Sequence, residues 1–262
     1  MSPVLTDFGS SLRRWRTSRR FSQLQLAVEA DVSSRHVSFL ETGRARPSRE
    51  MIVHLSTVLE IPLRDRNQLL QSAGFAPVYS HRDITAPEME SIRRVLRTIL
   101  DANEPNPAAV VDRKGDLIDA NAAALHLLGS VVEPNSPALL PMINFNRITL
   151  HPEGIRKRTT NWEELGATVL QRLEQEQRHR QADTELQSIL DEVLNYEGVA
   201  ALRHQALPSS GAGLVIPLRI TTLDGQHRSF ISTIATIGAP HDVTVDELRL
   251  ETFYETEEAV NA

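Results

Sequence analysis

The chain has 262 residues and a formal net charge of −6, and 40% of its residues are hydrophobic. This length accommodates one large or two ordinary globular domains. The complete absence of cysteine excludes disulfides, thiolate catalysis and cysteine-based zinc sites. The chain contains no apolar run long enough to span a bilayer, and its N-terminus lacks the pattern of a signal peptide, so we expect a cytoplasmic protein with no membrane partner.

The most specific local pattern lies between Phe21 and Ser48. Ser22 followed by Gln25 forms a capping box, which predicts the start of a helix. Asp31 tolerates the left-handed backbone of a sharp turn, after which a second short helix buries Val37 and Leu40 on one face. Helical spacing of apolar residues also predicts helices that open after Ser48 and Pro62, so we expect five helices over the first 75 residues.

This region resembles the XRE (Cro/C1-type) helix-turn-helix regulators. The resemblance runs from about Phe8 to Ala73 and rests on Ser22-Gln23, Leu26-Ala27, Val32-Ser33, Leu40-Glu41, Gly43 and Pro47-Ser48. It implies that Arg16 pairs with Glu41, which lies near the end of the recognition helix. Arg20 departs from the family pattern, because a glycine commonly ends the first helix there.

The charge distribution agrees with a DNA-binding head. Residues 1–75 contain eleven arginines against seven acids, a net charge of +4, which leaves −10 for the rest of the chain. We expect double-stranded DNA as a partner, with base contacts from Ser34, Arg35 and Phe39. Packing of Phe39 against a neighbouring helix remains the alternative. The predicted phosphate contacts come from Ser22, Gln23, His36, Arg44 and Arg46.

A linker is expected over residues 76–90, where Gly74 precedes it and Pro77 and Pro87 lie within it, and a helix is expected over 89–102. Alternation and turn signals then predict five strands, at 108–111, 117–119, 214–222, 228–237 and 247–254. A helix at 121–128 follows the second strand, and residues 147–204 form a large helical insertion. This insertion either roofs a pocket over the sheet or forms a dimer face.

The strand, turn, strand and helix at 108–128 resemble the opening of a PAS sensor domain. The order of parts across nearly the whole chain resembles regulators with an XRE head and an MmyB-type, PAS-like ligand-binding domain, carried by the segments 69–79, 107–128, 144–154, 161–166 and 230–255. The fold class is therefore α+β. We expect a five-helix DNA-binding bundle at 1–75 and a PAS-like domain with a five-stranded antiparallel sheet at 91–262.

The predicted ligand site lies between the sheet and the insertion. We expect the sheet to contribute Leu218, Phe230, Ile234, Leu248 and Leu250. The roof is expected to contain Phe145, Leu150, Trp162, Leu165 and Val169, with a polar mouth for a carboxylate formed by Asn144, Arg147 and His151. Ordinary core packing is the alternative for each of them.

No catalytic, metal or cofactor motif accompanies these patterns, so we expect neither an enzyme nor a bound cofactor. The sequence predicts a bacterial one-component transcription regulator that responds to a small apolar or amphipathic ligand, for which the resemblance suggests a fatty acid. The alternative is a repressor-like DNA-binding protein whose second domain binds a partner protein. A homodimer is expected, because two heads must reach adjacent half-sites on DNA.

Overall fold

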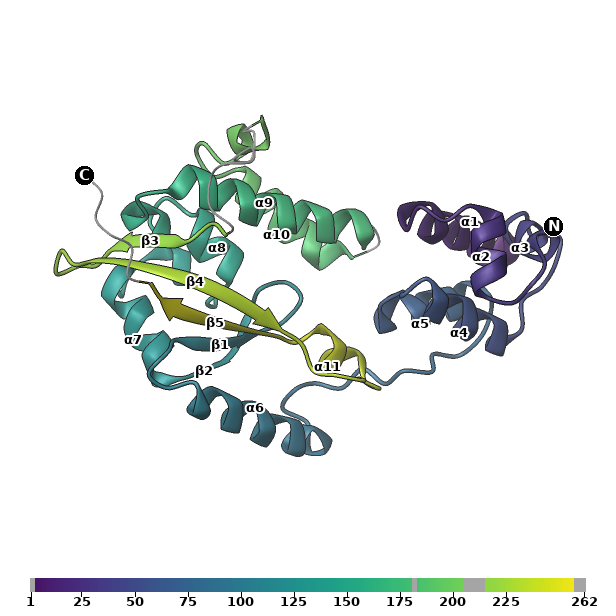
Figure 1. Cartoon of the computed structure of the whole chain (residues 1–262), viewed down its shortest axis with the longest axis horizontal. Helices are drawn as coiled ribbons and strands as arrows, with labels where there is room; N and C mark the ends of the chain where they lie inside the picture. The colour runs from purple at the N-terminus through teal and green to yellow at the C-terminus, as the bar shows by residue number, and fades with distance from the viewer. Residues whose placement is uncertain (1–2, 181–182, 205–214, 257–262) are drawn as a thin grey trace. The chain divides into compact units, whose positions relative to one another are not determined.

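The computed structural model describes residues 3–180, 183–204 and 215–256. The chain divides into two compact units (Figure 1). The first contains Met1–Asp83 together with Ala239–Asp246, and the second contains Ile84–Gly238 with Glu247–Ala262. Within the described residues, no helix combines the length and apolarity that crossing a membrane requires.

Five helices form most of the first unit, as predicted. Ser22 caps α2 in a complete capping box with Gln25, and Ser33 and Ser48 accept backbone N–H groups at the starts of α3 and α4, each at 3.1 Å. Local polar residues therefore set where these helices begin. The helices are α1 (Pro3–Ser18), α2 (Gln23–Glu29), α3 (Ser34–Glu41), α4 (Arg49–Val58) and α5 (Leu63–Ser72).

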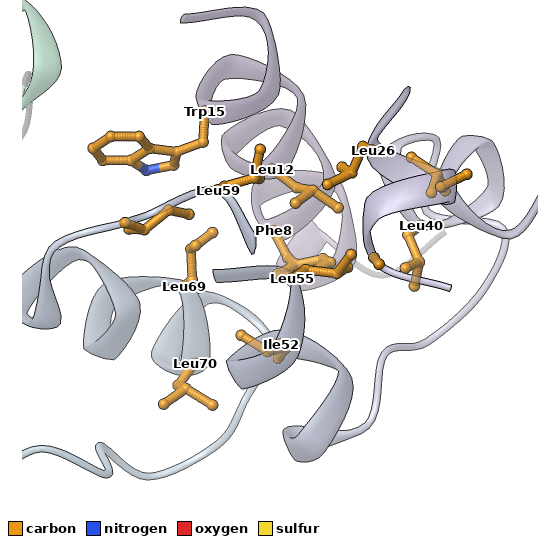
Figure 2. Close-up of a cluster of buried hydrophobic side chains, with 14 residues drawn as sticks. Phe8, Leu12, Trp15, Leu26, Leu40, Ile52, Leu55, Leu59, Leu69 and Leu70 are labelled. Carbon is orange, nitrogen blue, oxygen red and sulfur yellow. The ribbon is translucent and has the colours of Figure 1, made fainter. Parts of the chain in front are cut away.

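One apolar core joins all five helices. Figure 2 shows the side chains that converge on it: Phe8, Leu12, Trp15, Leu26, Leu40, Ile52, Leu55, Leu59, Leu69 and Leu70. The first and third helices approach especially closely at Gly9, where an added Cβ would lie 2.5 Å from the carbonyl oxygen of Glu41. Glycine at this position therefore allows α1 to hold the C-terminal end of α3 in place.

Residues 239–246 belong to the first unit although they lie between two strands of the second. They include all but the last residue of the short helix α11 (Val243–Glu247). The Val243 N–H donates to the carbonyl of Ser80 at 2.8 Å. Arg82 pairs with Asp242 at 2.9 Å, while the Asp246 carboxylate accepts the backbone N–H of Leu63 at 3.1 Å. The β4–β5 connection thus caps α5, an arrangement that the sequence patterns do not predict.

The second unit is built on the predicted five-stranded antiparallel sheet, in the order β2-β1-β5-β4-β3. The 3-10 turn η1 (Pro87–Met89) and helix α6 (Glu90–Ala102) precede it, and α7 (Ala122–Val131) follows the first two strands. Leu214, where the third strand was expected to begin, lies outside the described residues. The strands are β1 (Ala108–Val111), β2 (Leu117–Ala120), β3 (Leu218–Thr221), β4 (His227–Ala235) and β5 (Arg249–Glu255).

Helices cover both faces of this sheet (Figure 1). Leu96 and Leu100 of α6 pack on one face against Ala108, Val110 and Leu248. The opposite face carries α7 and part of the insertion. Elements of the insertion and the loop before it are η2 (Pro137–Leu139), α8 (Phe145–Leu150), η3 (Ile155–Arg158), α9 (Trp162–His179), α10 (Thr184–Leu194) and η4 (Ala200–His204).

Candidate functional site

The turn between α2 and α3 has the geometry that the sequence predicts. Asp31 has a positive φ of 49°, and so does Arg20 at 61°, the position where a glycine was expected from the resemblance. On α3, Val37 and Leu40 are fully buried, whereas Ser34 and Arg35 are exposed. The buried face anchors the helix in the bundle and leaves its N-terminal residues free to meet DNA.

Arg35 and Phe39 lie together on the outer face of α3. The guanidinium carbon of Arg35 is 5.1 Å from the centroid of the Phe39 ring, which is half-buried and does not belong to the core cluster. This stacking limits the rotamers of both side chains. An arginine in this position can present two of its N–H donors to a guanine while the ring lies beside it.

Glu41 links the first helix to the helix-turn-helix. Its carboxylate accepts two bonds from Arg16, at 2.5 and 3.0 Å, and a third from Gln23 Nε2 at 2.7 Å. The Arg16–Glu41 pair implied by the resemblance is therefore confirmed. Because the Arg16 side chain is 9% exposed and that of Glu41 2%, the pair is shielded from solvent. It fixes α3 relative to α1 and the start of α2.

The other predicted DNA contacts lie on α3, at the start of α2 and in the segment after α3. Ser22, Arg44 and Arg46 are exposed, while Gln23 and His36 are half-buried. The Ser22 hydroxyl accepts the Gln25 N–H in the capping box, and its own hydroxyl proton is free to turn outward. Gln23 is already bonded to Glu41, so any phosphate contact must come from its remaining donor.

The second unit contains a cavity of about 860 Å³ between the sheet and the insertion. This volume lies within the range of small-molecule sites. Its walls come from β1, β2, α7, α8, α9, β3, β4 and β5, and they are largely apolar. Helix α9 presents Leu165, Val169 and Arg172 to the cavity, while Leu170 and Leu173 on its other side pack toward α10. The insertion therefore roofs a pocket, one of its two predicted roles.

Four of the predicted ligand residues line this cavity: Phe145, Leu165, Val169 and Leu218. Two predicted roof residues do not. Leu150 is buried among the helices of the insertion, and Trp162 packs there beneath the guanidinium of Arg156, 3.6 Å from its ring. Trp162 is the first residue of α9. Its side chain packs against the buried cluster that α9 forms with α10 and η4, and not against the sheet.

The predicted polar mouth is wrong in its position. Asn144 caps α8 and donates to Asp116 at 2.8 Å, Arg147 forms a two-pronged pair with Glu192 at 2.7 and 2.8 Å, and His151 lies edge-on to Tyr196. None of the three lines the cavity. Their spacing puts them on one side of α8, whereas Phe145, Ile148 and Thr149 face the cavity from the other.

The predicted sheet face also needs correction. Phe230 is fully buried beside Ile220, and Ile234 lines a smaller neighbouring cavity of about 120 Å³ rather than the main one. Leu248 and Leu250 pack on the opposite face, against the α6 cluster. Because apolar layers cover both faces of the sheet, the alternation of β5 does not reveal which side meets a ligand. The β5 side chains at the main cavity are Glu251 and Phe253.

The polar groups that do line the cavity were missed at the sequence level. Glu251 is 7% exposed, and its carboxylate accepts from Arg172 of α9 at 3.3 Å. Burial raises the pKa of Glu251 above its ordinary value, against the opposing effect of Arg172. The only signal in the sequence was an acid placed two residues before Phe253, on the same face of the strand. The remaining polar lining residues are Thr149, Glu164, Thr168, Arg219 and Ser232.

Comparison with known proteins gives two family matches. Residues 92–262 match the MmyB-like transcription regulator ligand binding domain, and residues 7–69 match a helix-turn-helix domain. No relative is found among curated proteins. Both matches point to transcription regulators rather than to enzymes.

Two solved structures show weak similarity. The clp gene regulator ClgR from Corynebacterium glutamicum is 21% identical, over 40% of this chain and 97% of its own, with a TM-score of 0.25. An RNA-binding Light-Oxygen-Voltage receptor is 14% identical, over 95% of this chain and 60% of its own, with a TM-score of 0.27. The family matches carry the assignment. With its DNA-binding helix-turn-helix and its matched ligand-binding domain, the chain belongs to the MmyB-like transcription regulators.

Proposed function

We propose that this protein binds operator DNA as a homodimer and changes its DNA affinity when a small amphipathic ligand occupies the cavity of the second unit. The observation that carries the proposal is the cavity itself. A volume of about 860 Å³ with mostly apolar walls suits a metabolite, and polar groups lie on only part of its surface. A fatty acid is the initial candidate suggested by the sequence resemblance.

The head supports the DNA-binding part of this proposal. Arg35 is exposed near the start of α3, which supports a base contact there, and Arg44 and Arg46 are exposed beyond the helix, where phosphate contacts are expected. A head of this size reads a short half-site, and two copies are needed to read an operator. The half-sites are then about 34 Å apart, one turn of DNA. The acidic second unit is the proposed source of the two-fold interface.

A route for the response runs along the roof of the cavity. Helix α9 contributes Leu165 and Val169 to the lining, and Arg180 at its C-terminal end donates to Glu247 at 2.8 Å. Glu247 directly follows Asp246, whose carboxylate holds the first N–H of α5. A ligand that favours one position of α9 would therefore bias the segment that caps a helix of the head.

The test is to identify what the protein carries. The purified protein is denatured and extracted, and the extract is analysed by mass spectrometry beside that of Leu165→Trp, which fills the cavity. Gln171→Trp is the matched control, because Gln171 is exposed on the same helix. We expect one small molecule in the wild type and Gln171→Trp and none in Leu165→Trp. Equal amounts in all three would contradict the proposed site.

If no small molecule is recovered, the purified protein is titrated with amphipathic probes of known structure. Binding that Leu165→Trp abolishes supports ligand sensing. An absence of binding, together with recovery of a partner protein on the second unit, favours the alternative of a DNA-binding protein regulated by another protein.

A further inference from the structure

The cavity carries a specific polar feature that its apolar character does not predict. Glu251 is the third residue of β5, where its backbone pairs with Ala109 of β1 and Ile234 of β4. Directly opposed residues share a face of the sheet, so these side chains surround the carboxylate. The directly opposed neighbours of Glu251 are therefore a methyl group and an aliphatic chain, neither of which can donate a hydrogen bond.

Among the described residues, the only ion-pair partner of Glu251 is Arg172, through a single bond of 3.3 Å. The side chain of Arg172 is 51% exposed, whereas that of Glu251 is 9% exposed. Charge-assisted bonds between nitrogen and oxygen are usually shorter, about 2.7–2.9 Å. The buried member of the pair is thus poorly compensated, while the solvated member needs little compensation.

Two other ion pairs of the same unit show shorter bonds, one to Glu192, whose side chain is 38% exposed, and one to the buried Glu247. Glu192 accepts two bonds from Arg147 at 2.7 and 2.8 Å, and Glu247 accepts one from Arg180 at 2.8 Å. Glu251 has neither the short distance nor the second bond. Burial accordingly raises its pKa, while hydrogen bonding lowers the pKa of Glu192. Glu251 is thus more deeply buried than Glu192 and less well hydrogen-bonded, and it faces the cavity.

Two of the three hydroxyl groups on the cavity wall do not supply the missing donor; the third belongs to Ser232 of β4, which pairs with Phe253. Thr149 donates to the carbonyl of Phe145 at 2.7 Å, and Thr168 donates to that of Glu164 at 3.0 Å. Both hydroxyl protons are therefore used within their own helices. A buried carboxylate without enough donors is costly, and a bound molecule that brings a donor removes that cost.

We propose that the cavity selects amphipathic molecules whose polar end carries an O–H or N–H donor, and that Glu251 is the residue that accepts it. This inference rests on the proposed ligand-sensing function and deepens it. A simple carboxylate would place a second negative charge beside Glu251, which like-charge repulsion disfavours, so this inference replaces the fatty acid suggested by the resemblance with a donor ligand. The donor class includes alcohols and amines, with an apolar body beside Phe253, Ile148 and Leu127.

The experiment compares four probes that share one alkyl chain: decylamine, 1-decanol, methyl decanoate and decanoate. Each is titrated by calorimetry into the emptied full-length protein. The variants are Glu251→Gln and, as a matched control, Glu164→Gln, a second carboxyl group on the cavity wall that accepts from Asn161. Leu165→Trp reports binding outside the cavity.

We expect the wild type to bind decylamine and 1-decanol roughly ten-fold or more tightly than methyl decanoate, since a hydrogen bond to a charged group discriminates by about this factor. Decanoate should bind most weakly. Glu251→Gln should lose most of the preference for decylamine and leave methyl decanoate unchanged, while Glu164→Gln should resemble the wild type.

Tightest binding of decanoate, or an order of affinities that Glu251→Gln leaves unchanged, would overturn the inference. Methyl decanoate tests whether the cavity binds ligands separately from whether Glu251 accepts a hydrogen bond. If the wild type binds it and Leu165→Trp does not, the cavity is a ligand site whatever the role of Glu251. If the wild type binds none of the four probes, the ligand-sensing function fails together with the inference.

Discussion

The carboxylate of Asp246 accepts the backbone N–H of Leu63, a residue 183 positions earlier in the chain. Leu63 opens α5, and the residue before it is Pro62, which offers no side-chain cap. A capping side chain normally comes from the residue at the start of the helix itself. Here the connection between two strands of the ligand-binding domain performs that task for a helix of the head.

We expect Asp246→Ala to destabilise the first unit by about 1 kcal/mol, the usual cost of losing a helix cap. Urea unfolding is followed through Trp15, which is buried in the core of the head, in a Trp162→Phe background that leaves it as the only tryptophan. Ser48→Ala, which removes the cap of α4, should cost a similar amount, and the exposed Glu29→Ala should cost little. An unchanged midpoint for Asp246→Ala would show that the bond does not stabilise the head.

Base recognition and phosphate contact predict different effects on DNA binding. Arg35→Ala should lose about 1–3 kcal/mol on the preferred operator and relax the preference at one base pair. Arg46→Ala should weaken binding to all sequences alike and reduce its dependence on salt. Fluorescence anisotropy with matched and mismatched operators at two salt concentrations separates these outcomes. Equal losses on all sequences for Arg35→Ala would mean that its contact is with phosphate.

The Arg16–Glu41 pair predicts a large loss of folding stability when only one of the two side chains is removed. Glu41→Ala leaves the buried Arg16 guanidinium without its carboxylate, and such losses are about 3–5 kcal/mol. The double variant Arg16→Met with Glu41→Leu should recover much of this stability, because neither charge then remains buried. Chemical unfolding of the three proteins measures the difference. A double variant as unstable as Glu41→Ala would indicate that shape rather than charge dominates.

Glu251 predicts a pH-dependent stability in the empty protein. Because burial raises its pKa, the folded protein holds this proton more tightly than the unfolded chain does. Its contribution to stability is therefore greatest at acidic pH and is lost as the pH rises through the folded pKa. The other charged groups that line the adjoining small cavity are Asp112, Arg113, Arg172, Glu176 and Arg249.

Glu251→Gln should accordingly raise the thermal midpoint of the empty protein near neutral pH more than at mildly acidic pH. Calorimetry at the two pH values checks this, with Glu164→Gln as the control. A midpoint that falls at neutral pH would mean that the bond to Arg172 outweighs the cost of burying the carboxylate.

Much of the fold could be predicted from short-range patterns. Ser22, Ser33 and Ser48 set helix starts through contacts three residues away, and Gly225, with a φ of 87°, makes the turn that Asp224-Gly225 predicts. Such contacts depend on neighbours in the sequence, so local residue types are sufficient to indicate them.

The contacts that were not predicted join distant segments. Nothing near Asp246 indicates that it meets Leu63, and nothing near Arg147 indicates Glu192 rather than a ligand. For Glu251 the sequence does not show which face of β5 meets the cavity, because both faces have apolar partners. Leu248 and Leu250 were therefore assigned to the cavity, whereas they pack against α6. Only the register of the sheet, with Ala109 opposite Glu251, resolves this.

The central claim is that a molecule in the cavity controls the affinity of the head for DNA. The most direct measurement is the dissociation constant for operator DNA selected from a random library, with the emptied protein and after addition of the molecule recovered from it. We predict at least a roughly five-fold change in the wild type and in Gln171→Trp, within the usual range of allosteric coupling, and no change in Leu165→Trp. The same affinity with and without the molecule in the wild type, or an equal change in Leu165→Trp, would contradict the account.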